Sequence, residues 1–190
     1  MRGLGERFKV KSDIWQRKQN GIVQYIIPDF KVRHQELRFL FEAEKEITEG
    51  YDEFFYSGSV LVDRCAGPNL RFSYAGTYKQ LFPSKSNNNR PSHLLKTPLY
   101  LRYTETDQPY CPTHGYTLTL RCVPTFNISP QSTYAINLAT LTGYRPVFEN
   151  DFLVLAGKIH FGSIFGSKTI TIPPPERLYA GSQCLLRGYK

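Results

Sequence analysis

Cysteine and histidine side chains that lie close together are the first candidates for chemistry, because together they can hold a metal ion. Cys111 and His114 are separated by two residues, and Cys122 follows a little further along the chain. A structural zinc site needs four converging ligands with a recognisable spacing, and the remaining histidines stand alone in the sequence. We therefore expect no metal site and no cofactor.

Glu105 and Asp107 resemble the paired carboxylates of general acid–base catalysis. They stand just before Pro109, however, in a segment with the character of a solvated turn. The sequence also lacks a zinc-protease HExxH motif, a GxSxG nucleophile motif, a GxGxxG motif and a phosphate-binding glycine loop. We assign no catalytic residue and expect that the protein is not an enzyme.

Basic residues supply the strongest compositional signal, because the formal net charge is +8. Such a charge attracts anionic polymers and lipid surfaces over roughly a Debye length. The segment 1–20 is polar and reads as a flexible basic arm, an ordinary solvated tail being the alternative. We expect this arm to bind an anionic membrane surface through Arg2, Arg7, Lys9, Lys11, Arg17 and Lys18.

A second basic stretch, residues 64–104, contains no acidic residue. We expect it to contact a nucleocapsid or, without sequence specificity, nucleic acid through Arg71, Lys79, Lys85, Arg90 and Lys96. An acidic block lies between the two basic stretches. It is a candidate for self-association through Glu42, Glu44, Glu46 and Glu49, although a solvated helix end would look the same.

Composition and periodicity favour strands. The chain has 13 Tyr, 13 Phe, 13 Pro and 14 Gly in 190 residues, which leaves little room for long helices. Strands are predicted at residues 22–27, 54–62, 98–104 and 116–123, and at 152–161 and 168–172 as a final hairpin. Short helices are predicted at residues 35–47, within 70–81 and at 134–141. In residues 116–123, apolar and polar side chains alternate, which predicts one packed face and one wet face.

The fold class that we predict is therefore α+β and mostly β. It is a compact antiparallel sheet or sandwich with one to three short helices, in a single globular domain over residues 21–190 behind the arm. No apolar run approaches the roughly 20 residues of a membrane-spanning helix, and the first 20 residues do not resemble a secretory signal. We expect peripheral membrane contact only.

The order of these elements resembles that of rhabdovirus matrix proteins. The similarity runs over residues 50–172 and is carried by Tyr51–Tyr56, Arg71–Tyr74, Arg90–Leu95, Tyr116–Leu120, Phe152–Ile159 and Thr169–Ile172. The resemblance implies a basic arm on the inner membrane leaflet and a core that condenses the nucleocapsid. The arm lacks the Pro-Pro-x-Tyr and Pro-Thr-Ala-Pro budding signals of the animal-virus members, which favours a plant-infecting type.

A weaker resemblance points to plant-virus movement proteins of the tubule-forming or plasmodesmal class. Ser57–Arg64 resembles their strand that ends in Asp, and Val123–Ile128 resembles a later strand. We keep a movement protein, and a small jelly-roll capsid subunit, as alternatives. The preferred hypothesis is a self-associating viral matrix protein that bridges nucleocapsid and membrane, located in the virion, the host cytoplasm and the inner membrane face.

Overall fold

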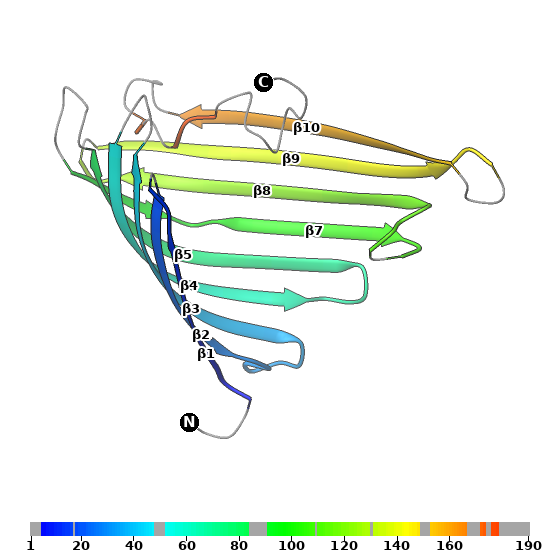
Figure 1. Ribbon diagram of the computed structural model, residues 1–190, viewed down its shortest axis with the longest axis horizontal. Coiled ribbons are helices and arrows are strands. Elements are labelled where there is room, and N and C mark those ends of the chain that lie inside the picture. The colour runs from blue at the N-terminus through cyan, green and yellow to red at the C-terminus, as the bar shows by residue number, and fades with distance from the viewer. Residues whose placement is uncertain are drawn as a thin grey trace.

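The computed structural model describes residues 5–16, 18–47, 52–83, 91–108, 110–129, 131–148, 153–166, 172–173 and 176–178. These residues form a single antiparallel sheet of ten strands (Figure 1). The strands are β1 (Arg7–Ile14), β2 (Lys18–Ile27), β3 (Gln35–Ile47), β4 (Asp52–Cys65), β5 (Leu70–Pro83), β6 (Ser92–Lys96), β7 (Leu99–Thr106), β8 (Gly115–Asn127), β9 (Ser132–Pro146) and β10 (Val154–Gly166). Within the described ranges, no helix is long and apolar enough to cross a membrane.

The strands follow one another across the sheet with one local exception. β6 and β7 occupy the same place between β5 and β8: β6 pairs with β5 at Thr77–Leu81, and β7 pairs with β5 at Leu70–Tyr74. The interruption falls at Pro98, which has no N–H to donate to a ladder. Its carbonyl still accepts a hydrogen bond from the backbone N–H of Ala75 at 2.9 Å. The chain therefore leaves strand conformation between β6 and β7, but the sheet continues across this point.

The turn between β7 and β8 is held by Asp107. Its carboxylate accepts hydrogen bonds from the hydroxyl of Thr113 at 2.7 Å and from the backbone N–H groups of Thr113 at 3.0 Å and His114 at 3.1 Å. These bonds, that of the Thr113 hydroxyl first, lower the pKa of Asp107 to about 2. Gly115 closes the turn at φ +110°, where a Cβ atom would lie 1.9 Å from the carbonyl oxygen of Glu105.

The packed core is small and lies on one face of the sheet. One cluster consists of Val123, Tyr134, Ile136 and Ile172, and the other of Phe55, Leu81 and Leu94. Ile172 follows β10 in the chain, so a segment after the last strand lies against β8 and β9. We call this face, which Ile172 covers, the inner face and the opposite one the outer face.

The structure corrects the predicted helices. Residues 35–47, 70–81 and 134–141 all lie in strands, β3, β5 and β9. Leu37, Leu40, Phe41 and Glu44 have helical spacing, but Leu37, Phe39 and Phe41 also alternate, and pairing with β2 and β4 selects the alternation. A sandwich is also wrong, because all ten strands belong to one sheet.

The flexible arm is likewise wrong for the residues that the structure describes. Residues 7–14 form β1, and residues 18–20 begin β2. The two strands pair from Arg7 with Ile26 to Ile14 with Gln19. Polar and apolar residues alternate along most of β1, which is the period of a strand, although its charged residues resemble a solvated arm.

Candidate functional site

The two faces of the sheet differ in polarity, and β8 illustrates the difference. Register with β7 and β9 places Tyr116, Leu118, Leu120 and Cys122 on the outer face. Thr117, Thr119 and Arg121 point to the inner face. The alternation predicted for this strand is confirmed, but its sense is reversed, because Tyr116 is 41% exposed and Leu120 42% exposed. The apolar face is therefore the open one.

The same reversal extends across the sheet. Exposed large apolar side chains stand at alternate positions of strand after strand, and the register places them on the outer face. They include Phe8, Val10, Val23, Phe39, Phe41, Phe54, Val60, Tyr74, Leu99, Leu101, Phe126, Leu141, Ile159, Phe161 and Phe165. A soluble monomer rarely exposes an apolar surface this extensive, so the outer face requires an apolar environment.

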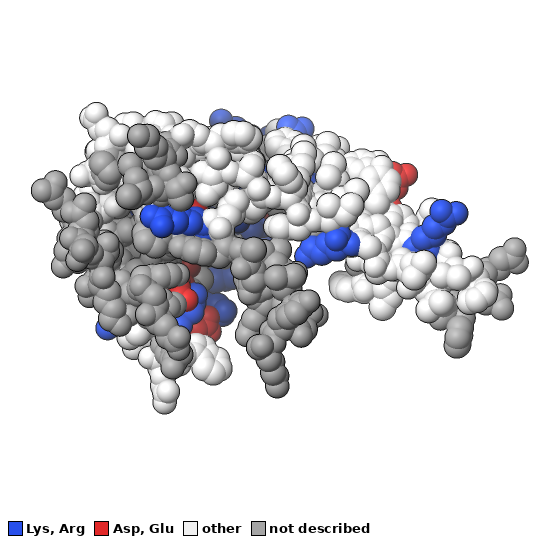
Figure 2. Space-filling model, turned by 90° about the horizontal axis from the view of Figure 1, so that it is seen from above, with Lys and Arg blue, Asp and Glu red and all other residues white. Residues whose placement is uncertain are grey.

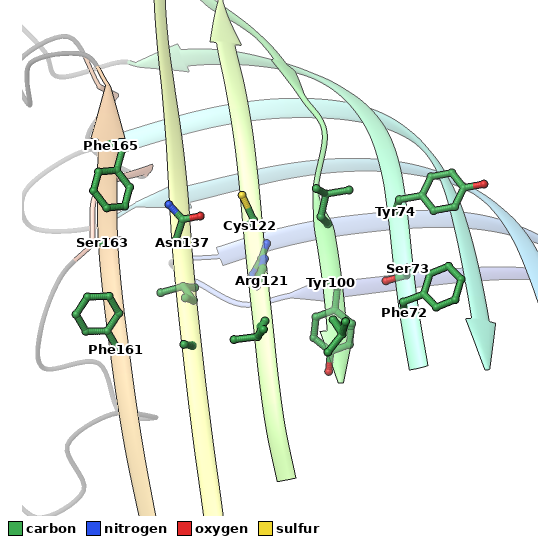
Figure 3. A pocket seen from close by; sticks show the side chains of 15 residues that line it. Phe72, Ser73, Tyr74, Tyr100, Arg121, Cys122, Asn137, Phe161, Ser163 and Phe165 are labelled. Atoms are coloured by element: carbon green, nitrogen blue, oxygen red, sulfur yellow. The ribbon is translucent and has the colours of Figure 1, made fainter. Parts of the chain in front are cut away.

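A shallow groove of about 690 Å³ runs over the outer face. Figure 3 shows the rings of Phe161 and Phe165 on β10 at one side of it and those of Phe72 and Tyr74 on β5 at the other. The smaller side chains of Cys122 and Asn137 lie between them. Its lining thus comes from residues of β5 and of β7 to β10.

On the inner face, charged side chains of β1 to β5 form ion pairs with one another. Arg7 Nη2 lies 2.9 Å from Glu36 Oε1, and Arg38 Nη2 lies 2.6 Å from Glu36 Oε2. Asp63 then accepts from Arg38 Nη2 at 3.1 Å and also pairs with Arg71. One chain of ion pairs therefore links β1, β3, β4 and β5.

A second ion pair joins neighbouring strands nearer the β1–β2 turn. Lys18 Nζ on β2 donates to Glu44 Oε1 on β3 at 2.9 Å. The Glu44 side chain is 9% exposed, whereas that of Lys18 is 47% exposed. Asn20 Nδ2 donates to Glu42 Oε1 at 3.3 Å on the same face. Two residues of the acidic block, Glu42 and Glu44, therefore bind side chains of the neighbouring strand β2.

Glu176 anchors the segment after β10 to the inner face. Its Oε1 lies 3.3 Å from Lys79 Nζ, and its Oε2 lies 2.6 Å from Lys96 Nζ. All three side chains are at most 15% exposed, and Lys79 Nζ also lies 3.8 Å from the centre of the Phe55 ring. Burial alone would raise the pKa of Glu176, but the charges of Lys96 and Lys79 outweigh burial and lower it.

A cavity of about 370 Å³ lies beside this anchor, between the inner face and residues 176–178. Its lining is polar over much of its extent. The hydroxyl groups come from Ser57, Ser59 and Thr77, and Ser59 Oγ lies 2.8 Å from Thr77 Oγ1. Arg121 and Arg177 add positive charge to the wall. The inner face can therefore hold water and polar groups.

The comparisons with known proteins agree with this architecture. The family model of the Omp85 superfamily domain matches residues 1–190. The chain belongs to the Omp85 superfamily. The crystal structure of BamA from Haemophilus ducreyi lacking POTRA domains 1–3 is similar in fold, with a TM-score of 0.76 at 15% sequence identity. No curated protein matches the sequence.

The similarity to BamA covers 87% of this chain but 36% of the BamA chain, so this Omp85 chain spans about a third of the length of that structure. Membership of the superfamily overturns the viral interpretation. Matrix, movement and capsid functions are wrong. A nucleocapsid partner, a purely peripheral membrane contact and a location in the virion, the host cytoplasm or the inner membrane face are wrong as well. The resemblance to matrix proteins relied on the order of short strands, which unrelated β-rich chains share.

The structure places the described candidate residues of the Omp85 chain on one face. Arg7, Lys9, Lys11, Lys18, Arg71, Lys79, Lys96, Glu42, Glu44 and Glu46 all lie on strands β1 to β6 with inward register. Ion pairs join Lys11 to Asp13, Lys18 to Glu44, and both Lys79 and Lys96 to Glu176. Arg2, Arg17, Glu49, Lys85 and Arg90 lie outside the described residues.

Sequence reasoning missed Glu36, Arg38, Asp63 and Glu176, which hold these ion pairs. Glu36 and Arg38 alternate with apolar residues in β3, and that alternation was available as a signal, whereas Asp63 follows the apolar run Val60–Val62 in β4 and has no such pattern around it. Glu176 was not accessible in this way, because 97 residues separate it from Lys79. Among the described residues, which include Cys111, His114 and Cys122, no group of three or more His, Cys, Asp and Glu side chains could hold a metal ion.

Proposed function

We propose that the ten strands are a membrane-embedded part of an outer-membrane β-barrel, with the outer face against lipid and the inner face lining a polar interior. The observation that carries this proposal is the reversed polarity of the sheet. Transmembrane barrels alternate apolar residues toward lipid and polar residues toward the lumen. A charged, ion-paired inner face and an exposed apolar outer face follow that pattern.

The dimensions of the outer face support the same proposal. Tyr116 and Phe126 are both outward residues of β8, ten positions apart. At roughly 3.3 Å per residue they are roughly 33 Å apart along the strand. If the strand is tilted by roughly 40° from the barrel axis, this separation is about 25 Å along the axis. That height equals the apolar band of outer-membrane barrels.

Aromatic side chains stand at both ends of this band. At one end the rings of Tyr103 and Tyr116 lie 5.9 Å apart. At the other end the ring of Phe82 lies 5.8 Å from Phe54 and 5.7 Å from Tyr56. Aromatic girdles at the two lipid–water interfaces are typical of transmembrane barrels, because these rings combine apolar area with a polar edge or hydroxyl group.

The edges of the sheet bear on how much of a barrel the strands form. β1 and β10 are the edge strands of the described sheet. Lipid offers no hydrogen bonds to an open edge, so both edges must be paired within a membrane. We infer that further strands complete the barrel, in keeping with the 36% of the BamA chain that is covered.

The role that we propose is insertion of proteins into, or their transport across, the outer membrane, in keeping with membership of the Omp85 superfamily. We assign no enzymatic step to it. Binding surfaces, a polar interior and paired strands are sufficient for such a role, since it needs no bond to be made or broken.

A pair of neighbouring substitutions tests the membrane orientation. Leu120→Arg places a charge near the middle of the outer band and should weaken folding into lipid vesicles by about 2–4 kcal/mol. Thr119→Arg adds the same side chain to the inner face and should cost less than about 1 kcal/mol. Protease protection of the vesicle-bound chain measures both. Equal tolerance of the two variants would overturn the proposed orientation.

The functional role is tested separately. Vesicles that contain the chain should fold an added small outer-membrane barrel protein faster than empty vesicles do, as measured by its heat-dependent electrophoretic migration. Vesicles with the Leu120→Arg variant are the control. If the wild-type chain inserts into vesicles but does not accelerate folding of the added protein, the proposed role in insertion is wrong while the membrane orientation stands.

A further inference from the structure

The inner face of β7 to β10 carries positive charge without matching acids. β6 to β10 contain a single carboxylate, Glu105, whose register places it on the outer face and whose Oε2 accepts from the hydroxyl of Tyr103. The inward basic side chains are Arg102, Arg121 and Lys158. All three are exposed, and no ion pair joins them to a carboxylate in the described part of the chain.

Hydroxyl groups surround these cations. The register places Arg102 beside Thr119, which lies beside Thr140 on β9, and Thr140 beside His160 on β10. One step along the strands, Thr104, Thr117, Thr142 and Lys158 form the next cross-strand row. The Thr140 Oγ1 atom lies 2.7 Å from His160 Nδ1. The surface therefore offers hydrogen-bond partners between its positive charges.

The spacing of the cations suits carboxylates on an extended chain. Arg102 and Arg121 are diagonal neighbours on adjacent strands, roughly 7–8 Å apart. Lys158 lies three strands from β7, which is roughly 14 Å across the sheet. Side chains at alternate positions of an extended segment are roughly 7 Å apart. An extended segment that crosses the strands could present one carboxylate to each cation.

The chain itself contains an example of this mode of binding. Glu176, in a segment that is not a strand, places one carboxylate oxygen on Lys79 and the other on Lys96 of the same inner face. The described residues 172–173 and 176–178 cover the face around Lys79 and Lys96, where Glu176 is bound, and around Tyr134 to Leu138, where Ile172 and Leu178 pack. Arg121 is directly opposite Leu138, so it lies beside this cover and lines the cavity next to Glu176. Arg102 and Lys158 lie further along β7 and β10 toward the β7–β8 turn. From above, Lys and Arg side chains stand along this length of the molecule with few acidic ones beside them (Figure 2).

The residues that follow Glu176 in the sequence cannot supply the missing carboxylates. Residues 177–190 include neither Asp nor Glu, and Glu176 is already occupied by two lysines. Residues 177–190 are therefore not the occupant, and a partner that carries its own carboxylates fits this surface.

We propose that the inner face of β7 to β10 binds an acidic polypeptide segment, with its carboxylates on Arg102, Arg121 and Lys158 and its backbone beside the threonine hydroxyls. The inference rests on the proposed function in one respect: the inner face must line an accessible polar interior. It adds the chemical class of the polypeptide that this interior receives. A second chain with alternating acidic residues fits better than a compact phosphate, because the cations are spread over several strands.

The test uses the full chain folded in detergent micelles and a fluorescent peptide of alternating Glu and Thr. Removing three ion pairs by the triple variant Arg102→Gln, Arg121→Gln and Lys158→Gln should weaken peptide binding at least about tenfold, since exposed pairs contribute a few-fold each. A control triple variant, Lys9→Gln, Lys11→Gln and Arg33→Gln, removes the same charge elsewhere. It should change the affinity less than about twofold, because long-range attraction is screened by salt.

Two further comparisons complete the experiment. A peptide with Gln in place of Glu should not bind, and binding of the Glu peptide should weaken from roughly 0.05 M to 0.5 M salt. Equal losses in the two triple variants, binding of the Gln peptide, or binding of inorganic polyphosphate in place of the peptide would each overturn the proposal. Protease protection in vesicles is measured on the same variants. Wild-type chain that inserts but binds no peptide refutes this inference alone, whereas failure to insert refutes the proposed function.

Discussion

On the inner face of β1 to β5, Glu36, Glu44 and Asp63 each contact a basic side chain, whereas the strands β7 to β10 carry basic residues and no acids on this face. Asp63 contacts both Arg38 and Arg71, and Glu44 contacts Lys18. Among the described residues, the Arg102 side chain donates a hydrogen bond only to the hydroxyl of Thr104, at 3.2 Å. The two halves of one sheet, built by the same alternation, thus differ in whether their charges are satisfied internally.

This difference separates structural charges from available ones. A carboxylate held between two guanidinium groups stabilises the fold and is costly to remove, since the partners are left without compensation. An exposed cation without a partner contributes little to stability and remains open to an incoming anion. Substitutions in the two halves should therefore have effects of different size, and in one case of different sign.

The largest effect is expected at Glu176, which joins the segment after β10 to both lysines. Glu176→Gln keeps the shape of the side chain but leaves Lys79 and Lys96 without a counter-charge. Breaking a buried ion pair in this way costs about 3–5 kcal/mol. The midpoint of urea unfolding in detergent micelles measures the loss. Glu42→Gln is the control in the same cavity wall, and it should cost less than about 1.5 kcal/mol because only the Asn20 amide is lost.

The pH dependence of unfolding gives an independent measurement of the same anchor. The pKa of Glu176 is lowered in the folded chain, so its contribution is fully present above the ordinary value of 4.5 and is lost as the pH falls through the folded-state pKa. The difference in stability between wild type and Glu176→Gln should shrink over this acidic range. A difference that stays constant with pH would show that charge does not hold the segment.

Some features of this fold follow from the sequence and others do not. Strands were predictable wherever apolar and polar residues alternate, as in residues 116–123, because the period of two belongs to the chain alone. The polarity of the two sides was not predictable from that alternation. Tyr116, Leu120 and their neighbours were assigned to a packed face, but the alternation is the same whether the apolar side meets a core or lipid.

Ion pairs were less predictable still, because they depend on register and on distant segments. Lys18 and Glu44 are 26 residues apart and meet only through the register of β2 with β3. The acidic block was therefore interpreted as a surface for self-association. Counting charges identified Lys18, Lys79 and Lys96 as candidates, but could not reveal that their partners lie within the same chain.

The next largest effect is expected at Asp63. Asp63→Asn removes the charge that Arg38 and Arg71 share, and an amide oxygen cannot satisfy both guanidinium groups. Hydrogen bonds to charged groups contribute about 1.5–3 kcal/mol, which is the expected loss in urea unfolding. Asp13→Asn is the matched control, because its pair with Lys11 is exposed and should contribute less than about 1 kcal/mol. Equal losses would mean that burial of Asp63 does not strengthen its ion pairs.

A smaller effect is expected for Lys18 and Glu44, of which only the carboxylate is buried. A double-mutant cycle with Lys18→Met and Glu44→Gln isolates the interaction between the two side chains. The coupling free energy should be about 0.5–1 kcal/mol and should fall at high salt, since Lys18 is accessible to solvent. A coupling free energy near zero would mean that the ion pair between Lys18 and Glu44 does not stabilise the sheet.

The smallest effect, and the one with the opposite sign, is expected on the inner face of β7 to β10, which has no acids. Arg102 lies directly opposite Arg71 across β5 and β7, and like charges in that position destabilise a sheet. Arg102→Gln should therefore leave the free energy of unfolding unchanged within about 0.5 kcal/mol or raise it slightly. Added salt should stabilise wild type relative to this variant, whereas salt should weaken the ion pairs of β1 to β5. A clear loss of stability in Arg102→Gln would reveal an acidic partner within the chain. The charges on the inner face of β7 to β10 would then be paired within the chain, as they are on β1 to β5.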